Sequence, residues 1–398
     1  MSNFTEDTKI KGHIDWYILL PIIGLMLFSI AFVYSASYTI SDLKLRSTDN
    51  LFIKHGINVL LGIIVMIITS AIDYQHWKKI SKYGLIGAII LLVIVIFHGA
   101  GAKGATRWIS LGFVRFQPSE LAKFALVIHF ATLLSQKQKV IKSFNEGFLP
   151  FLLWTGLVCV LIALQPNFSN TAVIFLIAFS MMFIGNINLL HLSSMLVVCI
   201  IGGGIFAVSA TYRLNRILAY LGMGDGSAAT ENVNYQLNQA LLAIGNGGIH
   251  GVGAGQSRQS HMFLPESYGD FIFSVIGEEY GFIGLTLIIL AFVMIFWRGM
   301  SVAKKAPDNF GYYLAVGILV TFAFYVFVNA GVNTGLLPTT GVPFPFLSYG
   351  GTAILIYSFA MGILLNISAQ ANVYPRNNFE QDLDDDDEVD EIKLVDFN

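Results

Sequence analysis

Long stretches without a charged residue recur along the whole chain. Trp16–Ser37 alone runs for 22 residues without a charge, and a helix of that length crosses about 30 Å of hydrocarbon at 1.5 Å per residue. Of the 398 residues, 55% are hydrophobic and 12% are charged, whereas soluble domains carry about 25% charged residues. The sequence therefore predicts a polytopic membrane protein.

The apolar runs predict an all-α fold of about ten transmembrane helices. Besides Trp16–Ser37, the runs are His55–Ile72, Tyr83–Gly101, Leu121–Ser135, Gly147–Gln165, Thr171–Gly185, Leu189–Ala210, Phe282–Trp297, Gly311–Gly331 and Thr352–Leu365. Residues 15–370 then form one membrane domain, preceded by a cytoplasmic segment 1–14. The tail 371–398 is acidic and is predicted to be disordered and cytoplasmic.

Lysine and arginine residues are concentrated in three short loops, and this fixes the predicted orientation. They are Lys78, Lys79, Lys82, Lys137, Lys139, Lys142, Arg298, Lys304 and Lys305. With ten spans, all three loops and both termini lie on the same side of the membrane. Since positively charged short loops stay in the cytoplasm, that side is predicted to be cytoplasmic.

Two segments on the outer side are long for a compact protein, Gly99–Ser119 and Thr211–Gly269. Loops of this length are commonly functional or disordered. Helical apolar spacing in Tyr235–Ile244 predicts a short helix that lies on the membrane or dips into it. The glycine-rich stretch 251–256 lacks the strand and helix of a dinucleotide fingerprint, so we interpret its glycines as tight turns beside a ligand.

Cations gather in the same two outer segments, against the usual bias toward cytoplasmic loops. They are Lys103, Arg107, Arg115, Arg213, Arg216 and Arg258. Arginine and lysine are the usual partners of phosphate and carboxylate groups, so this cluster predicts an anionic ligand. The alternative is that these are ordinary solvated loop charges.

A charged pair also enters one predicted span. Pro118 can open a helix on which Glu120 and Lys123 are three residues apart and share a face. Because charges inside a membrane are costly and usually functional, we interpret the pair as part of a polar site. A structural ion pair is the alternative.

The segment 333–351 is rich in proline and glycine and cannot form a continuous helix. Irregular backbone at membrane depth is tolerated only when it is buried in protein or lines a polar cavity. This segment is therefore predicted either to line a polar cavity or to form a re-entrant loop that closes the bundle.

Three carboxylates, Asp270, Glu278 and Glu279, stand next to the predicted span Phe282–Trp297. Eight residues along a helix give a rise of about 12 Å and a turn of about 80°. On a continuous helix the glutamates therefore cannot act on the same reacting atom as Asp270. We predict a structural or cavity-lining role for both glutamates.

Three motifs occur together in this chain: ATRWISLGFVRFQPSELAKF (105–124), LPESYGDFIFSVIGEEYGFIG (264–284) and NAGVNTGLLPTTGVPFPFLSYGG (329–351). Together they resemble the SEDS family (shape, elongation, division, sporulation) over about residues 12–370. The resemblance implies a ten-span bacterial glycosyltransferase of the cytoplasmic (inner) membrane that polymerises peptidoglycan from lipid II. PTTG (338–341) is more similar to the division-type branch than to the elongation-type branch, which implies a place at the septum.

The resemblance also implies roles for particular residues. The catalytic acid that opens the family's D-F-I-F segment corresponds to Asp270. Residues that match its polar cavity and last-span motif, and so are expected to bind substrate, are Arg107, Gln117, Glu120, Lys123, Ser348, Tyr349 and Gly350. Many members carry His-Thr where this chain has Tyr268 and Gly269, and a glycine there predicts a looser backbone beside Asp270.

One carboxylate is enough for the implied reaction. Lipid II carries its disaccharide on a pyrophosphate, which is already a good leaving group, so the remaining need is a base for the attacking sugar hydroxyl. Conversion of an α-linked pyrophosphate into a β-1,4 bond fits one inverting displacement, with Asp270 as the base. The outer cations, Arg213 and Arg216 among them, are candidate pyrophosphate partners. A divalent cation, Mg²⁺ or Mn²⁺, is predicted to assist, with ligands that the sequence does not identify.

The implied partners are lipid II, membrane lipid, a class B penicillin-binding protein that acts as transpeptidase, and other division-complex proteins, with no nucleic acid. Two alternatives are open. A lipid II transporter would also carry intramembrane polar residues and broken helices, although the chain shows no inverted repeat. A non-catalytic scaffold of the division complex would leave the outer cation cluster unexplained.

Overall fold

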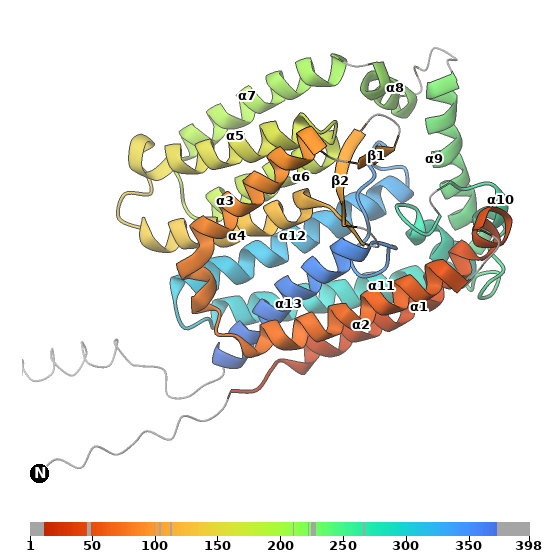
Figure 1. The fold of residues 1–398 in the computed structure, drawn as a ribbon, viewed down its shortest axis with the longest axis horizontal. Coiled ribbons are helices and arrows are strands. Elements are labelled where there is room, and N and C mark those ends of the chain that lie inside the picture. The colour runs from red at the N-terminus through yellow and green to blue at the C-terminus, as the bar shows by residue number, and fades with distance from the viewer. Residues whose placement is uncertain are drawn as a thin grey trace, which may run out of the picture.

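The computed structural model describes residues 12–45, 49–98, 100–102, 105–111, 114–209, 211–221, 223, 228–265 and 267–371. Long helices dominate it, and each of the ten predicted spans falls on one of them (Figure 1). These helices are α1 Trp16–Leu45, α2 Asp49–Ala71, α3 Gln75–His98, α4 Pro118–Gln136, α5 Leu149–Ala163, α6 Phe168–Ile184, α7 Leu189–Val208, α11 Ile272–Lys304, α12 Asn309–Asn333 and α13 Gly351–Ala371. A π-helical turn, η1 Phe144–Phe148, leads into α5.

Eight helices in the described part of the chain are long and apolar enough to cross a membrane. Helix α6 is apolar but has 17 residues, and α4 carries Glu120 and Lys123. The all-α polytopic membrane fold is therefore confirmed. That α4 and α6 also cross the membrane, and that both termini are cytoplasmic, stay predictions.

Helices α4, α12 and α13 form the centre of the bundle. Nearly every side chain of α4 is buried, on all sides of the helix, which is typical of a helix surrounded by others. Helix α4 packs against α12 and α3, and α13 packs against α2. In Figure 1, α1 and α2 run along one edge of the bundle and α7 runs along the opposite edge.

A small antiparallel sheet occupies the first long outer segment, for which the sequence predicted no regular structure. It consists of β1 Ala100–Ala102, β2 Ala105–Leu111 and β3 Val114–Phe116, in the order β1-β2-β3. Ile109 pairs with Phe116, so the sheet leads directly into α4. Strand β2 contacts both α3 and α4.

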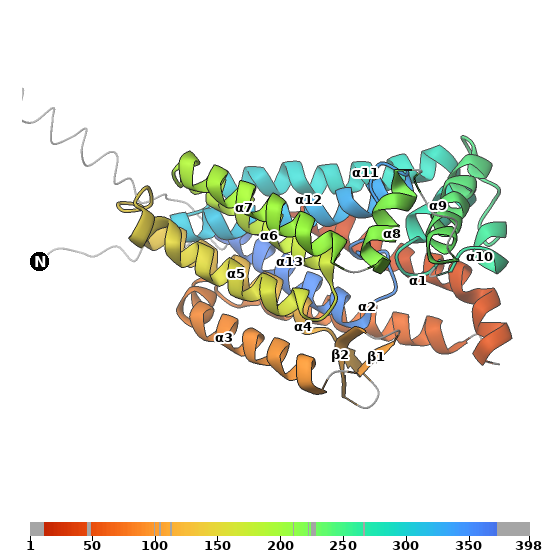
Figure 2. The ribbon, with the colours of Figure 1, turned by 90° about the horizontal axis from the view of Figure 1, so that it is seen from above.

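The second outer segment forms helices α8 Thr211–Tyr220, α9 Ala228–Gly247 and α10 Arg258–Met262. The predicted helix Tyr235–Ile244 lies within the longer α9, and its position on or in the membrane stays a prediction. Both views place these helices at the same end of the bundle as the sheet (Figure 1 and Figure 2). Helix α9 packs against α11.

Helix α11 is broken at Gly281, which has φ 64° and ψ −162°. The glycine-rich turn after α9 pairs with the broken backbone: Val252 N–H donates to the Glu278 carbonyl at 2.9 Å, and Phe282 N–H donates to the Gly248 carbonyl at 2.9 Å. A Cβ on Gly281 would lie 2.4 Å from the Gly251 nitrogen. The backbone of α11 is therefore one neighbour that requires glycine in these turns, and a ligand beside them stays a prediction.

Candidate functional site

Three successive backbone carbonyls before α11 are held from outside the segment. The Tyr268 carbonyl accepts from Tyr349 N–H at 2.9 Å, and the Gly269 carbonyl accepts from the Ser348 hydroxyl at 2.7 Å. The Asp270 carbonyl accepts two amide hydrogen bonds from α12, described below. These hydrogen bonds, from α12 and from the segment that follows it, restrain the backbone that Gly269 was predicted to loosen.

The Asp270 side chain lines a small cavity of about 50 Å³ between α8, α9, α12 and the segment after α12. The cavity is lined by Arg216, Gln236, Asp270, Phe271, Asn329, Val332, Thr339, Thr340, Gly341 and Val342. Gly341 has φ 87°, and a Cβ on it would lie 3.4 Å from Asp270 Oδ2. The irregular segment 334–350 therefore lines a polar cavity, which is the first of the two roles predicted for it.

Helix α8 covers this cavity and brings one predicted cation to it. Arg216 donates from Nη1 to the Thr339 carbonyl at 3.2 Å, and the Tyr220 hydroxyl donates to the Leu336 carbonyl at 2.9 Å. Arg216 and Asp270 thus share one cavity, although they are far apart in the sequence. Lys103 and the acidic tail lie outside the described residues, as do the side chains of Arg115 and Arg213.

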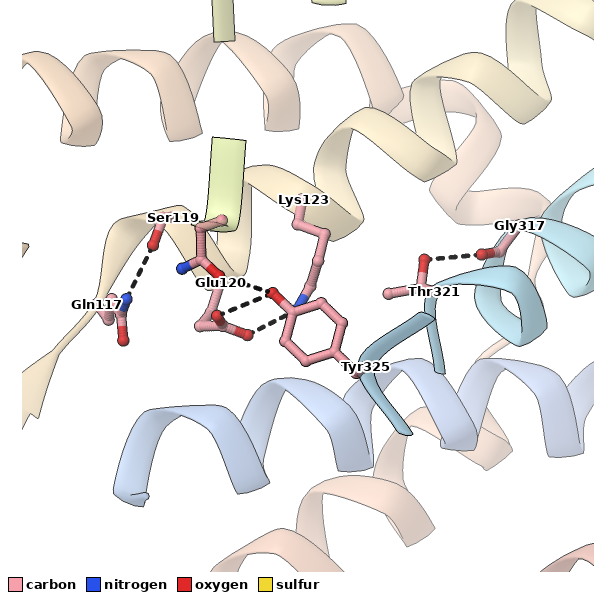
Figure 3. A network of polar contacts seen from close by, with 8 residues as sticks. Gln117, Ser119, Glu120, Lys123, Gly317, Thr321 and Tyr325 are labelled. Carbon is pink, nitrogen blue, oxygen red and sulfur yellow. Dashed lines mark hydrogen bonds and ion pairs between the residues drawn. The ribbon is translucent and has the colours of Figure 1, made fainter. Parts of the chain in front are cut away.

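The Glu120–Lys123 pair is buried in the centre of the bundle (Figure 3). Lys123 Nζ lies 2.7 Å from Glu120 Oε2, and each residue is 1% exposed. The Tyr325 hydroxyl lies 3.3 Å from both Glu120 Oε1 and Asn170 Oδ1. Tyr325, which contacts the pair, lies four residues before Asn329, which contacts Asp270, on the same helix.

Arg107 and Gln117 each have a hydrogen-bond partner within the protein. Arg107 projects from β2 and donates from its guanidinium to the Pro166 carbonyl, in the turn between α5 and α6. Gln117 precedes α4 and donates to the Ser119 hydroxyl at 3.1 Å. Gly350 stands directly before α13, and its carbonyl accepts from Ile354 N–H at 3.2 Å.

Both glutamates of α11 have structural partners. Glu278 Oε2 accepts from the Ser257 hydroxyl at 2.5 Å and from Gln259 N–H at 3.2 Å, so it holds the start of α10. Glu279 accepts from the Ser35 hydroxyl of α1. These contacts agree with the structural role predicted for both, and the break at Gly281 adds a turn that the sequence analysis did not foresee.

Sequence reasoning missed the polar face of α12. Tyr325, Asn329 and Asn333 follow one another at intervals of four, so they lie on one face of the helix. Tyr325 contacts the Glu120–Lys123 pair, and both asparagines contact Asp270. Polar residues at helical spacing within an apolar span were the signal that could have identified them.

A divalent cation is compatible with the residues around Asp270. The described residues contain no cluster of three or more His, Cys, Asp or Glu side chains that could hold a metal. Mg²⁺, however, is commonly bound through one or two carboxylates together with substrate phosphates. Asp270 supplies one such carboxylate in this cavity.

Taken together, the fold and the site define a polytopic membrane protein with a lone carboxylate and an arginine in a polar cavity at one end of its bundle. The cell cycle protein family of FtsW, RodA and SpoVE matches residues 15–373. The chain belongs to this family.

Curated relatives agree over nearly the whole length. The chain is 38% identical over 375 residues to "Probable peptidoglycan glycosyltransferase FtsW" of Geobacter metallireducens, covering 94% of this chain and 99% of the relative. It is also 38% identical over 355 residues to stage V sporulation protein E of Bacillus subtilis, covering 88% of this chain and 96% of the relative.

Solved structures share the fold at lower sequence identity. A chain from a peptidoglycan synthase complex that coordinates polymerization and crosslinking aligns with a TM-score of 0.74 and 21% identity, covering 90% of this chain and 98% of that one. The rod shape determining protein RodA of Thermus thermophilus aligns with a TM-score of 0.66 and 22% identity, covering 89% and 96%.

Proposed function

We propose that this chain is a peptidoglycan glycosyltransferase that polymerises lipid II into β-1,4 glycan strands, with Asp270 as the general base. Its FtsW-named relatives support the activity. The observation that carries the residue assignment is that Asp270 and Arg216 line one cavity beneath α8. The cavity thus combines a proton acceptor with a cation, the two groups that the reaction requires.

In the proposed reaction, the hydroxyl of the acceptor sugar attacks the anomeric carbon of a lipid-linked donor. The new C–O bond forms as the bond from that carbon to the pyrophosphate breaks, with inversion of configuration. The hydroxyl proton passes to the Asp270 carboxylate, and the bonding electrons leave with the pyrophosphate. Arg216 stabilises the charge that develops on the leaving group.

Two groups of residues would support this step. A divalent cation held by Asp270 would supply further charge neutralisation at the pyrophosphate. Arg107, Gln117, Glu120 and Lys123 would form the remainder of the substrate site, which requires the buried pair to become accessible. The other proposed substrate-binding residues are Arg213, Ser348, Tyr349 and Gly350.

We also propose where the enzyme acts and with which partner. The outer face of the bacterial cytoplasmic membrane is the expected site, since the helices α8 to α10 belong to the segment predicted to be outside. A class B penicillin-binding protein is the proposed transpeptidase partner, and the division septum is the proposed location, supported by the FtsW-named relatives.

The decisive experiment is glycan polymerisation by the purified full-length protein from labelled lipid II, with and without its partner. We expect glycan strands from the wild-type protein and none from an Asp270→Asn variant. Lipid II translocation in liposomes is the companion assay, because a transporter would move lipid II without making strands. Translocation with no glycan under any condition would overturn the proposal.

A further inference from the structure

Two asparagine side chains of α12 hold the backbone of Asp270. Asn329 donates from Nδ2 to the Asp270 carbonyl at 2.9 Å, and Asn333 donates from Nδ2 to the same oxygen at 3.0 Å. The two residues are 1% and 0% exposed. Since a carbonyl oxygen has two lone pairs, this asparagine pair occupies both acceptor positions of the Asp270 carbonyl.

Asn333 also fixes the beginning of α11. Its Oδ1 accepts from Ser274 N–H at 3.1 Å and from the Ser274 hydroxyl at 2.7 Å. The Asn333 amide therefore connects the backbone of Asp270 to the first turn of α11. An aspartate at 333 would keep the acceptor side of this arrangement and lose the donor side.

Asn329 fixes the segment that faces the carboxylate. Besides the Asp270 carbonyl, its Nδ2 donates to the Val342 carbonyl at 2.7 Å. Val342 follows Gly341, which lies against Asp270 Oδ2. The same amide thus sets both the backbone of Asp270 and the wall of the cavity opposite its side chain.

The asparagine pair is also internally satisfied. Asn333 Nδ2 lies 3.0 Å from Asn329 Oδ1, so each amide orients the other. Polar side chains within membrane helices are costly and are rarely retained without a function. Apolar residues of similar volume could fill the same space, but they could not hold three backbone segments in one register.

We propose that Asn329 and Asn333 are positioning residues that set the geometry of Asp270 for proton transfer. The proposal rests on the proposed role of Asp270 as the base. It requires that loss of the amide donors moves the carboxylate without removing the substrate site. A displacement of about 1 Å from the reactive geometry can cost about 10²-fold in rate.

The test combines kinetics with hydrogen–deuterium exchange of the full-length protein in nanodiscs. For Asn329→Asp and Asn333→Asp we expect kcat for labelled lipid II to fall by about 10²-fold, with KM changed less than about twofold. Backbone exchange in the segment 268–275 should accelerate in both variants. Ser274→Ala, which removes only the hydroxyl donor to Asn333, should show the same changes more weakly.

Asn366→Asp is the matched control. Asn366 is a buried amide of α13 that accepts from Tyr74 N–H at 2.9 Å and donates to the Ser70 carbonyl at 2.9 Å, at the other end of the bundle. Its replacement tests the cost of a buried amide-to-acid change alone. We expect it to leave exchange in 268–275 and kcat at the wild-type values.

Two outcomes would overturn the proposal. One is wild-type kcat and wild-type exchange in both asparagine variants. The other is an equal loss of kcat in Asn366→Asp, which would reduce the effect to general destabilisation. An Asp270→Asn variant that polymerises normally would instead overturn the proposed function, so the two failures are distinguishable.

Discussion

The ammonium group of Lys123 lies 3.6 Å from the centroid of the Tyr325 ring. The same group forms an ion pair with Glu120. The rings of Phe124 and Tyr357 lie within 5.0 Å of the same nitrogen. Cation–π contacts of this kind strengthen when water is excluded. The structure thus stabilises a charge in the centre of a membrane domain with one carboxylate and three aromatic faces.

Removal of either charge alone should therefore destabilise the protein. Lys123→Met leaves Glu120 buried without its partner, at a cost of about 3–5 kcal/mol. The double variant Glu120→Gln with Lys123→Met should regain most of that stability, because no uncompensated charge remains. Thermal unfolding in detergent measures both effects.

Glycan synthesis by the same double variant then separates the two interpretations of the pair. We expect the stable double variant to remain inactive if Glu120 and Lys123 contact substrate. Normal synthesis by the double variant would show that the pair is a structural ion pair.

Asp270→Asn should abolish glycan synthesis without unfolding the protein. The substitution keeps the size of the side chain but removes its charge and basicity, so we expect a loss of about 10²–10⁴-fold. The backbone of the residue is held by α12 and Ser348 regardless of the carboxylate. Melting temperature and co-purification of the transpeptidase partner should match the wild type.

Asp73→Asn serves as its control, because Asp73 is exposed in the turn between α2 and α3. We expect full activity from it. Near wild-type synthesis by Asp270→Asn would mean that another group takes the proton.

Gly281→Ala should destabilise the protein by more than about 1 kcal/mol, since alanine disfavours a positive φ and its Cβ would meet the Gly251 backbone. Gly203→Ala in α7 is the matched control, because a Cβ there meets nothing within 4 Å. A gain of about 0.5–1 kcal/mol is expected for the control from the lower backbone entropy of the unfolded chain. Equal melting temperatures for the two variants would contradict the strained break in α11.

Acid should destabilise the loop between α11 and α12 through Asp308. Burial raises the pKa of this carboxyl, but hydrogen bonds from the Tyr74 hydroxyl, the Gln75 amide and Gly311 N–H outweigh burial and hold the pKa below its usual value. Because the folded-state pKa is the lower one, the contribution is present above the unfolded pKa of about 3.9. It is lost as the pH falls through the folded pKa.

Melting temperatures of the wild type and Asp308→Asn between pH 7 and pH 3 measure this effect. Asparagine can still cap α12, so the variant isolates the charge. We expect the wild type to have the higher melting temperature at pH 7. The difference in melting temperature between the wild type and Asp308→Asn should become smaller below about pH 4. A constant difference would mean that the carboxylate charge contributes nothing.

Thiol labelling of whole cells tests the orientation. In a background without Cys159 and Cys199, a cysteine at the exposed position Ile249 should react with an impermeant reagent. A cysteine at Lys142, which is exposed in the turn between α4 and α5, should react only after the cells are permeabilised. The reverse pattern would place Asp270 on the cytoplasmic side and exclude wall assembly there.

The helices were predictable because their signal is local. An uncharged run such as that of α1 has few alternatives to a membrane helix, and all ten predicted spans coincide with helices. The sheet β1–β3 was not predictable, because two of its strands have only three residues and are too short to show an alternating pattern. The break at Gly281 was not predictable, because it depends on pairing with a distant segment. Gly281, for example, takes its conformation from the turn after α9.

The charged residues of the candidate site could be predicted from the sequence. The resemblance identified Asp270, and charge placement identified Arg216, which lines the same cavity. Asn329 and Asn333 of α12 were not predicted, because the role of an amide in an apolar helix depends on its hydrogen-bond partners. The sequence does not show those partners. Ser348 and Tyr349 were identified as site residues, and among their contacts are hydrogen bonds to the carbonyls of Gly269 and Tyr268.

The small cavity beside Asp270 has a kinetic consequence. Its volume of about 50 Å³ admits a few water molecules but no sugar ring. With Asp270 as the proposed base, the α8 wall of the cavity would have to move for an acceptor sugar to enter, and the Arg216–Thr339 and Tyr220–Leu336 contacts hold this wall. Movement of α8 would then be a step of the catalytic cycle, and its rate would set an upper limit on turnover.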